Sequence, residues 1–130
     1  MIHYLADYGV FLEKVRSWLK PGGILIYNVE HPVFTAYGSQ DWFYDEEGQI
    51  MHFPVDRYYI EGERESVFLG ENITKYHRTL TSYLDGLLTG GFRLLRVVEP
   101  APTEQAVREI PGMADELRRP MMLIVKAEKL

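Results

Sequence analysis

Two short segments bring together residue types that could support acid–base chemistry on a bound small molecule. In the first, Glu30, His31 and Pro32 follow an apolar run, and open α/β sheets bind their ligands beyond the carboxyl ends of such strands. Imidazole titrates near neutral pH, so His31 could remove a proton from a substrate oxygen or nitrogen, or donate a hydrogen bond, with Glu30 beside it. In the alternative interpretation, Glu30 and His31 only shape the exit of the strand ahead of proline.

The second segment consists of Tyr76, His77 and Arg78, just ahead of a predicted helix. The planar guanidinium of Arg78 could bind a carboxylate or phosphate of a substrate. His77 is the second candidate catalytic residue, and Tyr76 would contact the same substrate. In the alternative interpretation the segment is structural, with Arg78 paired to Glu99 or to an acidic residue of the region before it.

The elements that must position these segments are predicted from hydrophobic periodicity. Apolar residues at i, i+4, i+7 and i+8 predict an amphipathic helix over residues 7–20, with Asp7 as its N-cap. The apolar stripe consists of Phe11, Val15, Trp18 and Leu19. Proline and glycine at 21–23 end the helix, and the apolar run Ile24–Val29 is typical of a strand buried on both faces.

Further along the chain, residues 32–75 lose this periodicity and are rich in aromatic and acidic residues, so we expect a lid or insertion there. A second helix is predicted from Thr79, as N-cap, to Gly90. Phe92–Glu99 has the pattern of an edge strand and Met121–Ala127 that of a final buried strand, with a weak helix between residues 103 and 117.

Composition limits the possible functions. With 130 residues, 46% of them hydrophobic, we expect one folded domain over residues 1–130. The net charge of −5 disfavours nucleic acid as a ligand, and the absence of cysteine excludes disulfides and Cys-ligated metals. The histidines lack metal-binding spacing, so no metal site is expected. Neither a secretory signal nor a membrane-length apolar run is present, so we expect a cytoplasmic protein.

Several motifs, in their order and spacing, resemble the C-terminal half of class I SAM-dependent methyltransferases, of the types often labelled 11 and 12. The motifs are Leu19-Lys20-Pro21-Gly22-Gly23, Glu30-His31-Pro32, Tyr76-His77-Arg78-Thr79, Gly91-Phe92, Glu99-Pro100 and Arg118-Arg119-Pro120. The resemblance covers essentially the whole chain. It implies an α/β fold with part of a Rossmann-like sheet, in which Ile24–Val29, Met121–Ala127 and Phe92–Glu99 are strands five, seven and six, with strand seven antiparallel.

The same resemblance implies S-adenosylmethionine as cofactor and a small molecule as methyl acceptor. His3 and Tyr4 match a loop that runs beside the cofactor, although fraying at the chain start is the simpler interpretation of their position. His31, His77 and Arg78 would contact the acceptor. The glycine-rich loop and the acidic ribose-binding residue of the family have no counterpart in this sequence, so we expect the chain alone to be inactive.

Two functions follow as hypotheses. In the first, the chain is the acceptor-side half of a methyltransferase, with an aromatic lid that excludes water. In the second, it is a non-catalytic dimerisation or interaction module descended from one. A small α+β hydrolase is a weaker hypothesis, since no Gly-x-Ser-x-Gly motif is present. A strand Ile24–Val29 without its neighbour would expose an apolar edge, so we predict a homodimer joined there or a complex with a separately encoded N-terminal half.

Overall fold

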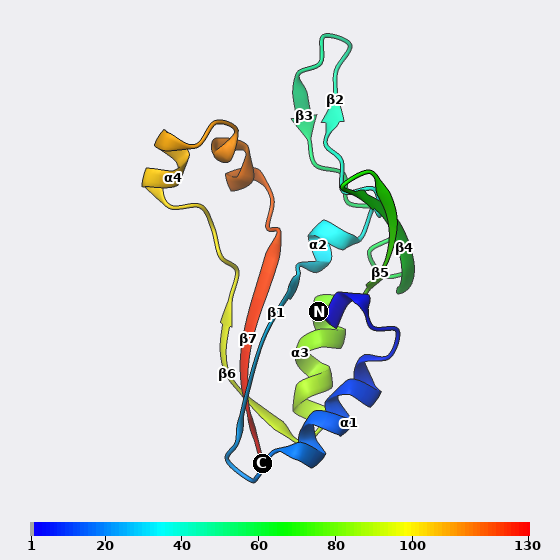
Figure 1. Cartoon of the computed structure of the whole chain (residues 1–130), viewed down its shortest axis with the longest axis vertical. Helices are drawn as coiled ribbons and strands as arrows, with labels where there is room; N and C mark the ends of the chain where they lie inside the picture. The colour runs from blue at the N-terminus through cyan, green and yellow to red at the C-terminus, as the bar shows by residue number, and fades with distance from the viewer. Residues whose placement is uncertain (1) are drawn as a thin grey trace.

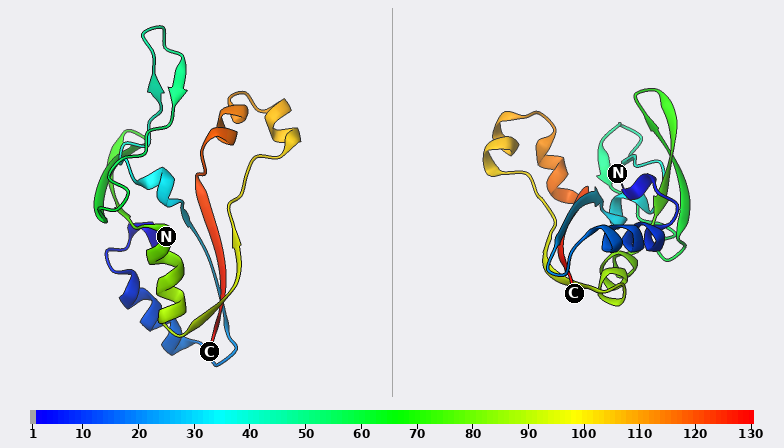
Figure 2. Two further views of the ribbon diagram at one scale, coloured as in Figure 1. Left: turned by 180° about the vertical axis from the view of Figure 1, so that it is seen from behind. Right: turned by 60° about the horizontal axis from the view of Figure 1, so that its bottom comes forward.

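The computed structural model describes residues 2–130. Met1, the first residue of the segment examined for a secretory signal, lies outside the described residues. Its lower body in Figure 1 is a three-stranded sheet with two helices packed against one face. Two hairpins and three short helical segments lie toward and beyond the upper end of that sheet. The molecule is therefore elongated, with its sheet and its hairpins at opposite ends (Figure 2, left).

The sheet consists of β1 (Ile24–Glu30), β6 (Phe92–Val98) and β7 (Met122–Lys129), in the order β1-β7-β6. β7 lies between the other two strands and is antiparallel to both, with Tyr27 and Val97 each opposite Val125. This arrangement confirms the sheet order implied by the resemblance. β6 is an edge strand, as its sequence pattern predicted.

Both long helices form where capping and periodicity predicted them. α1 (Tyr8–Trp18) begins after Asp7, whose side chain accepts a hydrogen bond from the amide of Val10. α3 (Leu80–Thr89) begins after Thr79, whose hydroxyl accepts from the amide of Ser82. These side chains satisfy amide groups that the first turn of a helix leaves without a partner.

The predicted buried face of α1 was wrong at one end. Trp18 is 74% exposed, whereas Tyr8, Leu12 and Val15 form the buried stripe. Residues four and three positions apart lie on the same face of a helix, so Tyr8, Leu12 and Val15 define the buried face. Trp18 lies outside this stripe.

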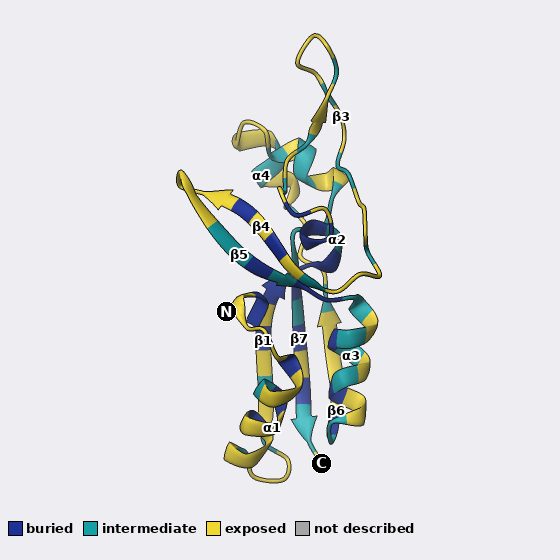
Figure 3. Ribbon diagram, turned by 90° about the vertical axis from the view of Figure 1, so that its right-hand side faces the viewer, coloured by how far each residue is buried: buried dark blue, intermediate teal, exposed yellow. Residues whose placement is uncertain are grey.

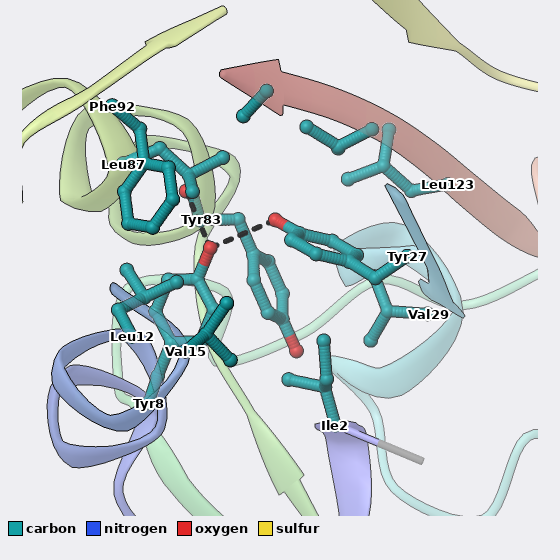
Figure 4. Close-up of a cluster of buried hydrophobic side chains, with 12 residues drawn as sticks. Ile2, Tyr8, Leu12, Val15, Tyr27, Val29, Tyr83, Leu87, Phe92 and Leu123 are labelled. Carbon is teal, nitrogen blue, oxygen red and sulfur yellow. Dashed lines mark hydrogen bonds between the residues drawn. The ribbon is translucent and has the colours of Figure 1, made fainter. Parts of the chain in front are cut away.

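The core lies between α1, α3 and one face of the sheet (Figure 4). Tyr83, Leu87 and Phe92 are almost fully buried there. Three tyrosines meet in this core: the hydroxyl of Tyr8 donates to the carbonyl of Tyr83, at 3.0 Å, and the hydroxyl of Tyr27 can therefore donate to that of Tyr8, at 2.8 Å. The buried hydroxyls of Tyr8 and Tyr27 are thus satisfied within the core. Burial raises the pKa of Tyr27 to about 12.

The other face of the sheet is open within residues 2–130, contrary to the prediction that Ile24–Val29 is buried on both faces. Ile24 and Ile26 are 42% and 62% exposed, whereas Tyr27 and Val29 point into the core. Figure 3 shows the alternation of buried and exposed residues along β1. The reason is that α1 and α3 both cover the same face of the sheet.

The aromatic region expected to be irregular contains a one-turn helix and two hairpins. These are α2 (Pro32–Thr35), the pair β2 (Phe43–Tyr44) and β3 (Ile50–His52), and the pair β4 (Gly62–Phe68) and β5 (Glu71–His77). The β2–β3 hairpin projects furthest from the sheet (Figure 2). The division of the chain at residues 32–75 and the function of this region as a lid stay predictions.

The remaining elements are η1 (Ile2–Tyr4), α4 (Glu104–Glu109) and η2 (Met113–Arg118). The weak helix predicted over residues 103–117 is thus two short segments, separated at Gly112, which adopts a positive φ of 81°. No helix within residues 2–130 is long and apolar enough to cross a membrane.

Two adjacent leucines of α3 provide a test of this packing. Leu87→Ala should lower the free energy of unfolding by about 2–5 kcal/mol, because Leu87 is fully buried and its removal leaves a cavity. Leu88→Ala, at a position 51% exposed on the same helix, should change it by only about 0.5 kcal/mol. Urea denaturation followed by circular dichroism measures both, and equal losses would contradict the described orientation of α3.

Candidate functional site

The residues that the sequence singled out gather at the carboxyl end of β1. η1 and β5 both contact this end, and α2 follows it directly and packs on β5. The structure thereby brings His3, Glu30, His31, His77 and Arg78 into one junction, which we call the β1 junction. All of these side chains are buried.

Glu30 and Lys75 form a buried ion pair at the centre of the β1 junction. The ammonium of Lys75 lies 2.6 Å from Oε1 and 3.1 Å from Oε2 of Glu30. Gln40 completes the network, because its amide nitrogen donates to Glu30 Oε2 at 2.6 Å and its amide oxygen accepts from Lys75 at 2.8 Å. Each charge is therefore compensated, as burial of an ion pair requires.

Lys75 and Gln40 were not among the residues that the sequence singled out. Lys75 is only 5% exposed, which is unusual for lysine. The one available signal is its spacing: Lys75 and His77 are two residues apart on β5, so they lie on the same face of the hairpin. Nothing in the local sequence around Gln40 indicates its pairing.

His3 is also held by Glu30. Its Nδ1 accepts a hydrogen bond from the backbone amide of Glu30 at 3.2 Å, and its Nε2 lies 3.5 Å from Glu30 Oε1. Burial lowers the pKa of His3, although the carboxylate of Glu30 acts in the opposite direction. The ring is therefore neutral near pH 7 and both of its nitrogens face Glu30.

His31 is engaged through both ring nitrogens as well. It is the N-cap of α2, with Nδ1 accepting from the amide of Val33 at 3.0 Å. The ring proton must then be on Nε2, which donates to Glu99 Oε2 at 2.5 Å. For His31 to act as a general base, as predicted, Glu99 would first have to release it.

His77 is fully buried between α2 and the segment before β4. Its Nε2 donates to the carbonyl of Tyr58 at 2.7 Å, and its Nδ1 accepts from the hydroxyl of Thr35 at 2.7 Å. Burial lowers its pKa, which favours the neutral ring that these two hydrogen bonds require. In this arrangement His77 joins α2 to the β4–β5 hairpin.

Arg78 does not pair with Glu99, the partner considered in the structural interpretation. Its guanidinium donates to the carbonyls of Ile2 and Leu5 and lies over the rings of Tyr8 and Tyr83, 5.6 and 5.8 Å from the ring centroids. Arg78 thus fastens the N-terminal segment to the core. Tyr76, by contrast, lies on the opposite face of β5 and is partly exposed.

A second cluster lies beyond the β1 junction, where aromatic residues surround Arg119. Its guanidinium carbon is 4.2–5.1 Å from the ring centroids of Phe34, Trp42 and Phe53. Glu116 binds the same guanidinium through Nε at 3.0 Å and Nη2 at 2.8 Å. The cluster connects α2 and the base of the β2–β3 hairpin to the start of β7 through cation–π contacts.

The residues predicted to contact S-adenosylmethionine, His3 and Tyr4, lie together in η1 and pack against the end of β1. Both nitrogens of His3 are directed at Glu30, and Tyr4 packs its ring against that of His3, with 4.4 Å between centroids. Within residues 2–130, the connections from β1 to α2 and from β6 to α4 contain no glycine. A glycine-rich turn is what lets a backbone approach a nucleotide closely.

Metal binding has no candidate in the part of the chain that the structure describes. No group of three or more His, Asp or Glu side chains within residues 2–130 is arranged to hold an ion.

Comparison with known proteins gives matches over the whole chain. A crystal structure from Listeria monocytogenes, assigned as an S-adenosylmethionine-dependent methyltransferase, is 49% identical, with a TM-score of 0.93, and this chain covers 58% of it. A crystal structure of an S-adenosylmethionine-dependent methyltransferase from Mesorhizobium loti is 36% identical, with a TM-score of 0.87, and is again covered over 58% of its length.

A search of curated proteins adds an uncharacterized protein from Haemophilus influenzae, 26% identical over 133 residues, of which this chain covers 50%. No protein-family model matches the chain. The chain therefore spans half to three fifths of the length of the proteins that it matches.

The Glu30–Lys75 pair generates one prediction. Lys75→Met should lower the free energy of unfolding by about 3–5 kcal/mol, because it leaves the carboxylate of Glu30 buried without a cation. Lys126→Met, at an exposed position of β7, is the matched control and should change stability little. Combining Lys75→Met with Glu30→Gln should restore part of the loss; a double variant as unstable as Lys75→Met would argue against an electrostatic cause.

His77 generates a second prediction, on pH dependence. Because burial lowers its pKa below the usual value of 6.5, the unfolded chain binds a proton more readily than the folded chain. The unfolding free energy should thus fall as the pH drops through and below 6.5, the unfolded value, by up to about 1.4 kcal/mol per pH unit for this group. His77→Asn should be less stable near neutral pH but lose less stability in acid.

The exposed His52 provides the control for this pH experiment, since His52→Asn removes a histidine without touching the β1 junction. Denaturant titrations of the three proteins across the acid range give the slopes. If the His77→Asn chain lost stability as steeply as the unsubstituted chain, the neutral, buried state of His77 would not be a source of the pH dependence.

Proposed function

We propose that this chain, which matches part of a class I SAM-dependent methyltransferase in fold and sequence, supplies the methyl-acceptor side of such an enzyme. The observation that carries the proposal is the match to the Listeria monocytogenes structure, at 49% identity and a TM-score of 0.93 over the full length of this chain. We further propose that the acceptor is a small molecule, since the region beyond the sheet offers small grooves, of about 340 and 130 Å³.

In this proposal the β1 junction fixes the acceptor side of the enzyme. Glu30, Lys75 and His77 hold α2 and the β4–β5 hairpin against the end of β1. The aromatic rings around Arg119 hold the base of the β2–β3 hairpin nearby, where the hairpin can exclude water from a bound acceptor. The candidate site residues Glu30, His31, His77 and Arg78 thus act chiefly by positioning these elements, whereas Tyr76, on the partly exposed face of β5, remains a proposed substrate contact.

Binding of S-adenosylmethionine is proposed for the complete enzyme and not for residues 2–130 alone. His3 is committed to Glu30, and the strand-to-helix connections lack the glycines that a nucleotide-binding turn needs. We therefore expect this chain by itself to have no methyltransferase activity. We propose a cytoplasmic location because the sequence contains no cysteine and no secretory signal was recognised in it.

The edge of β1 is the proposed contact for the rest of such an enzyme. β1 pairs only with β7 among the strands of residues 2–130, so its other edge keeps backbone groups without a strand partner. Ile24 and Ile26 expose apolar surface beside it. A separately encoded N-terminal half or a second copy of the chain would cover this surface.

The exposure of Ile24, Ile26 and Trp18 also favours the second candidate, a non-catalytic interaction module. The two candidates differ in whether the assembled protein binds S-adenosylmethionine. They agree on the surface through which the chain associates.

The two candidate functions can be distinguished by combining this chain with the part of a matched protein that it does not cover. The segment of the Listeria monocytogenes protein that this chain does not match can be co-expressed with the chain and the product titrated calorimetrically with S-adenosylmethionine. We expect binding by the assembled pair and none by the chain alone at millimolar ligand. Ile26→Lys should weaken assembly, because it places a charge on the proposed contact, whereas Glu46→Lys on the distant β2–β3 turn should not.

Light scattering on the same samples reports the assembly. A chain that stays monomeric alone and also fails to join the added segment would contradict the proposed contact. A stable homodimer without cofactor affinity in either sample would favour the interaction module instead.

A further inference from the structure

A groove of about 340 Å³ lies beyond the end of β6. None of the residues considered so far as substrate contacts lines it. Glu99, Pro100 and Ala101 line one side of it, and Leu117 and Pro120 line the other. It lies near the β1 junction, because Glu99 accepts the hydrogen bond of His31. The groove therefore opens at the carboxyl ends of the parallel strands β1 and β6, where α/β sheets bind ligands.

The cationic side chains of this groove are already paired. Arg119 binds Glu116 through two nitrogens, and its side chain is only 9% exposed among the aromatic rings. Arg118 pairs with Asp115 at 3.1 Å and donates to the carbonyl of Met51. Nη1 of Arg119 has no hydrogen-bond partner within residues 2–130, but this atom is buried and offers no surface to a ligand. Both arginines therefore fix the position of the groove wall.

Glu99 is different, because its carboxylate has no cation beside it in residues 2–130. Its one partner there is His31, which must be neutral since Nδ1 accepts the amide of Val33. That hydrogen bond occupies Oε2 of Glu99, and no hydrogen bond within residues 2–130 reaches Oε1. The side chain is 57% exposed and lines the groove.

The surroundings of this carboxylate decide which ligand would fit. Pro100, Ala101, Leu117 and Pro120 provide apolar contact next to one negative charge. A metal ion would need further oxygen or nitrogen ligands, and no group of three such residues occurs within residues 2–130. An anion would be repelled by Glu99. A compact ammonium group attached to an apolar body would complement both the negative charge of Glu99 and the apolar side chains that line the groove.

We propose that this groove binds a primary or secondary amine, with Glu99 as the residue that contacts its nitrogen and His31 as the residue that positions Glu99. The amine itself follows from the groove alone; only its identification as the methyl acceptor rests on the proposed function. A charge-assisted hydrogen bond from the ammonium to Oε1 gives the contact its direction.

The experiment uses benzylamine as the probe, titrated calorimetrically into the chain without S-adenosylmethionine. Benzyl alcohol and benzoate carry the same ring with a neutral and a negative group. We expect benzylamine to bind about tenfold more tightly than benzyl alcohol, and benzoate to bind least. Glu99→Gln should remove the preference for benzylamine, whereas Glu46→Gln, which makes the same change on the exposed β2–β3 turn, should preserve it.

Chemical shifts of the unsubstituted chain give a measurement that depends on no variant. Benzylamine should perturb the amides of Glu99, Ala101 and Leu117 more than those of α1. Perturbations elsewhere, equal affinity for the three probes, or unchanged selectivity in a folded Glu99→Gln chain would overturn the proposal. His31→Asn can keep the cap of α2 but cannot hold Glu99, so it should weaken the selectivity for benzylamine without abolishing folding.

Because these titrations contain no S-adenosylmethionine, their outcome is independent of cofactor binding. Failure of benzylamine to bind would remove the amine site and leave the methyltransferase proposal as it stands. Failure of the assembled pair to bind S-adenosylmethionine would remove that proposal and leave the amine site to be judged on its own data.

Discussion

The buried pair of Glu30 and Lys75 is the contact on which the arrangement beyond the sheet depends. A carboxylate at the end of β1 can be buried only if a cation and further hydrogen bonds compensate its lost hydration. Lys75 supplies the cation from β5, Gln40 donates a hydrogen bond to the carboxylate, and His3 accepts one from the backbone amide of Glu30. One residue of the sheet thereby specifies where four separate parts of the chain must meet. The cost of leaving any of these groups unpaired makes this junction more specific than apolar packing alone would be.

Local signals in the sequence were enough to predict α1, α3 and their caps, since Asp7 and Thr79 act on amides only three residues away. The order of the sheet came from the resemblance, because pairing between distant strands leaves no local pattern. Two predictions failed for the same reason. The exposure of Trp18 and the open face of β1 depend on which face the helices cover, and that is a tertiary property.

The sequence singled out some of the residues that meet at the β1 junction, but neither Lys75 and Gln40 nor the hydrogen bonds that join the residues. Glu30, His31 and His77 do lie together, because they stand at the ends of elements that converge on the same point. Their partners could not be read from the sequence: Thr35, Tyr58 and Glu99 are separated from them by long stretches of chain. The one sequence pattern that bears on these contacts is the spacing of Lys75 and His77, which are two residues apart on β5 and therefore lie on the same face of the strand.

The position of β7 has a consequence for how the chain acquires its structure during synthesis. All sheet pairing of β1 and β6 within residues 2–130 is with β7, which follows both strands in the chain. Until β7 is synthesised, the apolar stripes of α1 and α3 have no complete sheet to cover, and β1 has no strand partner. The residues of β1 pair with residues about a hundred positions later, as Ile26 does with Lys126. Such distant pairing makes folding slow and concentrates it in one late event.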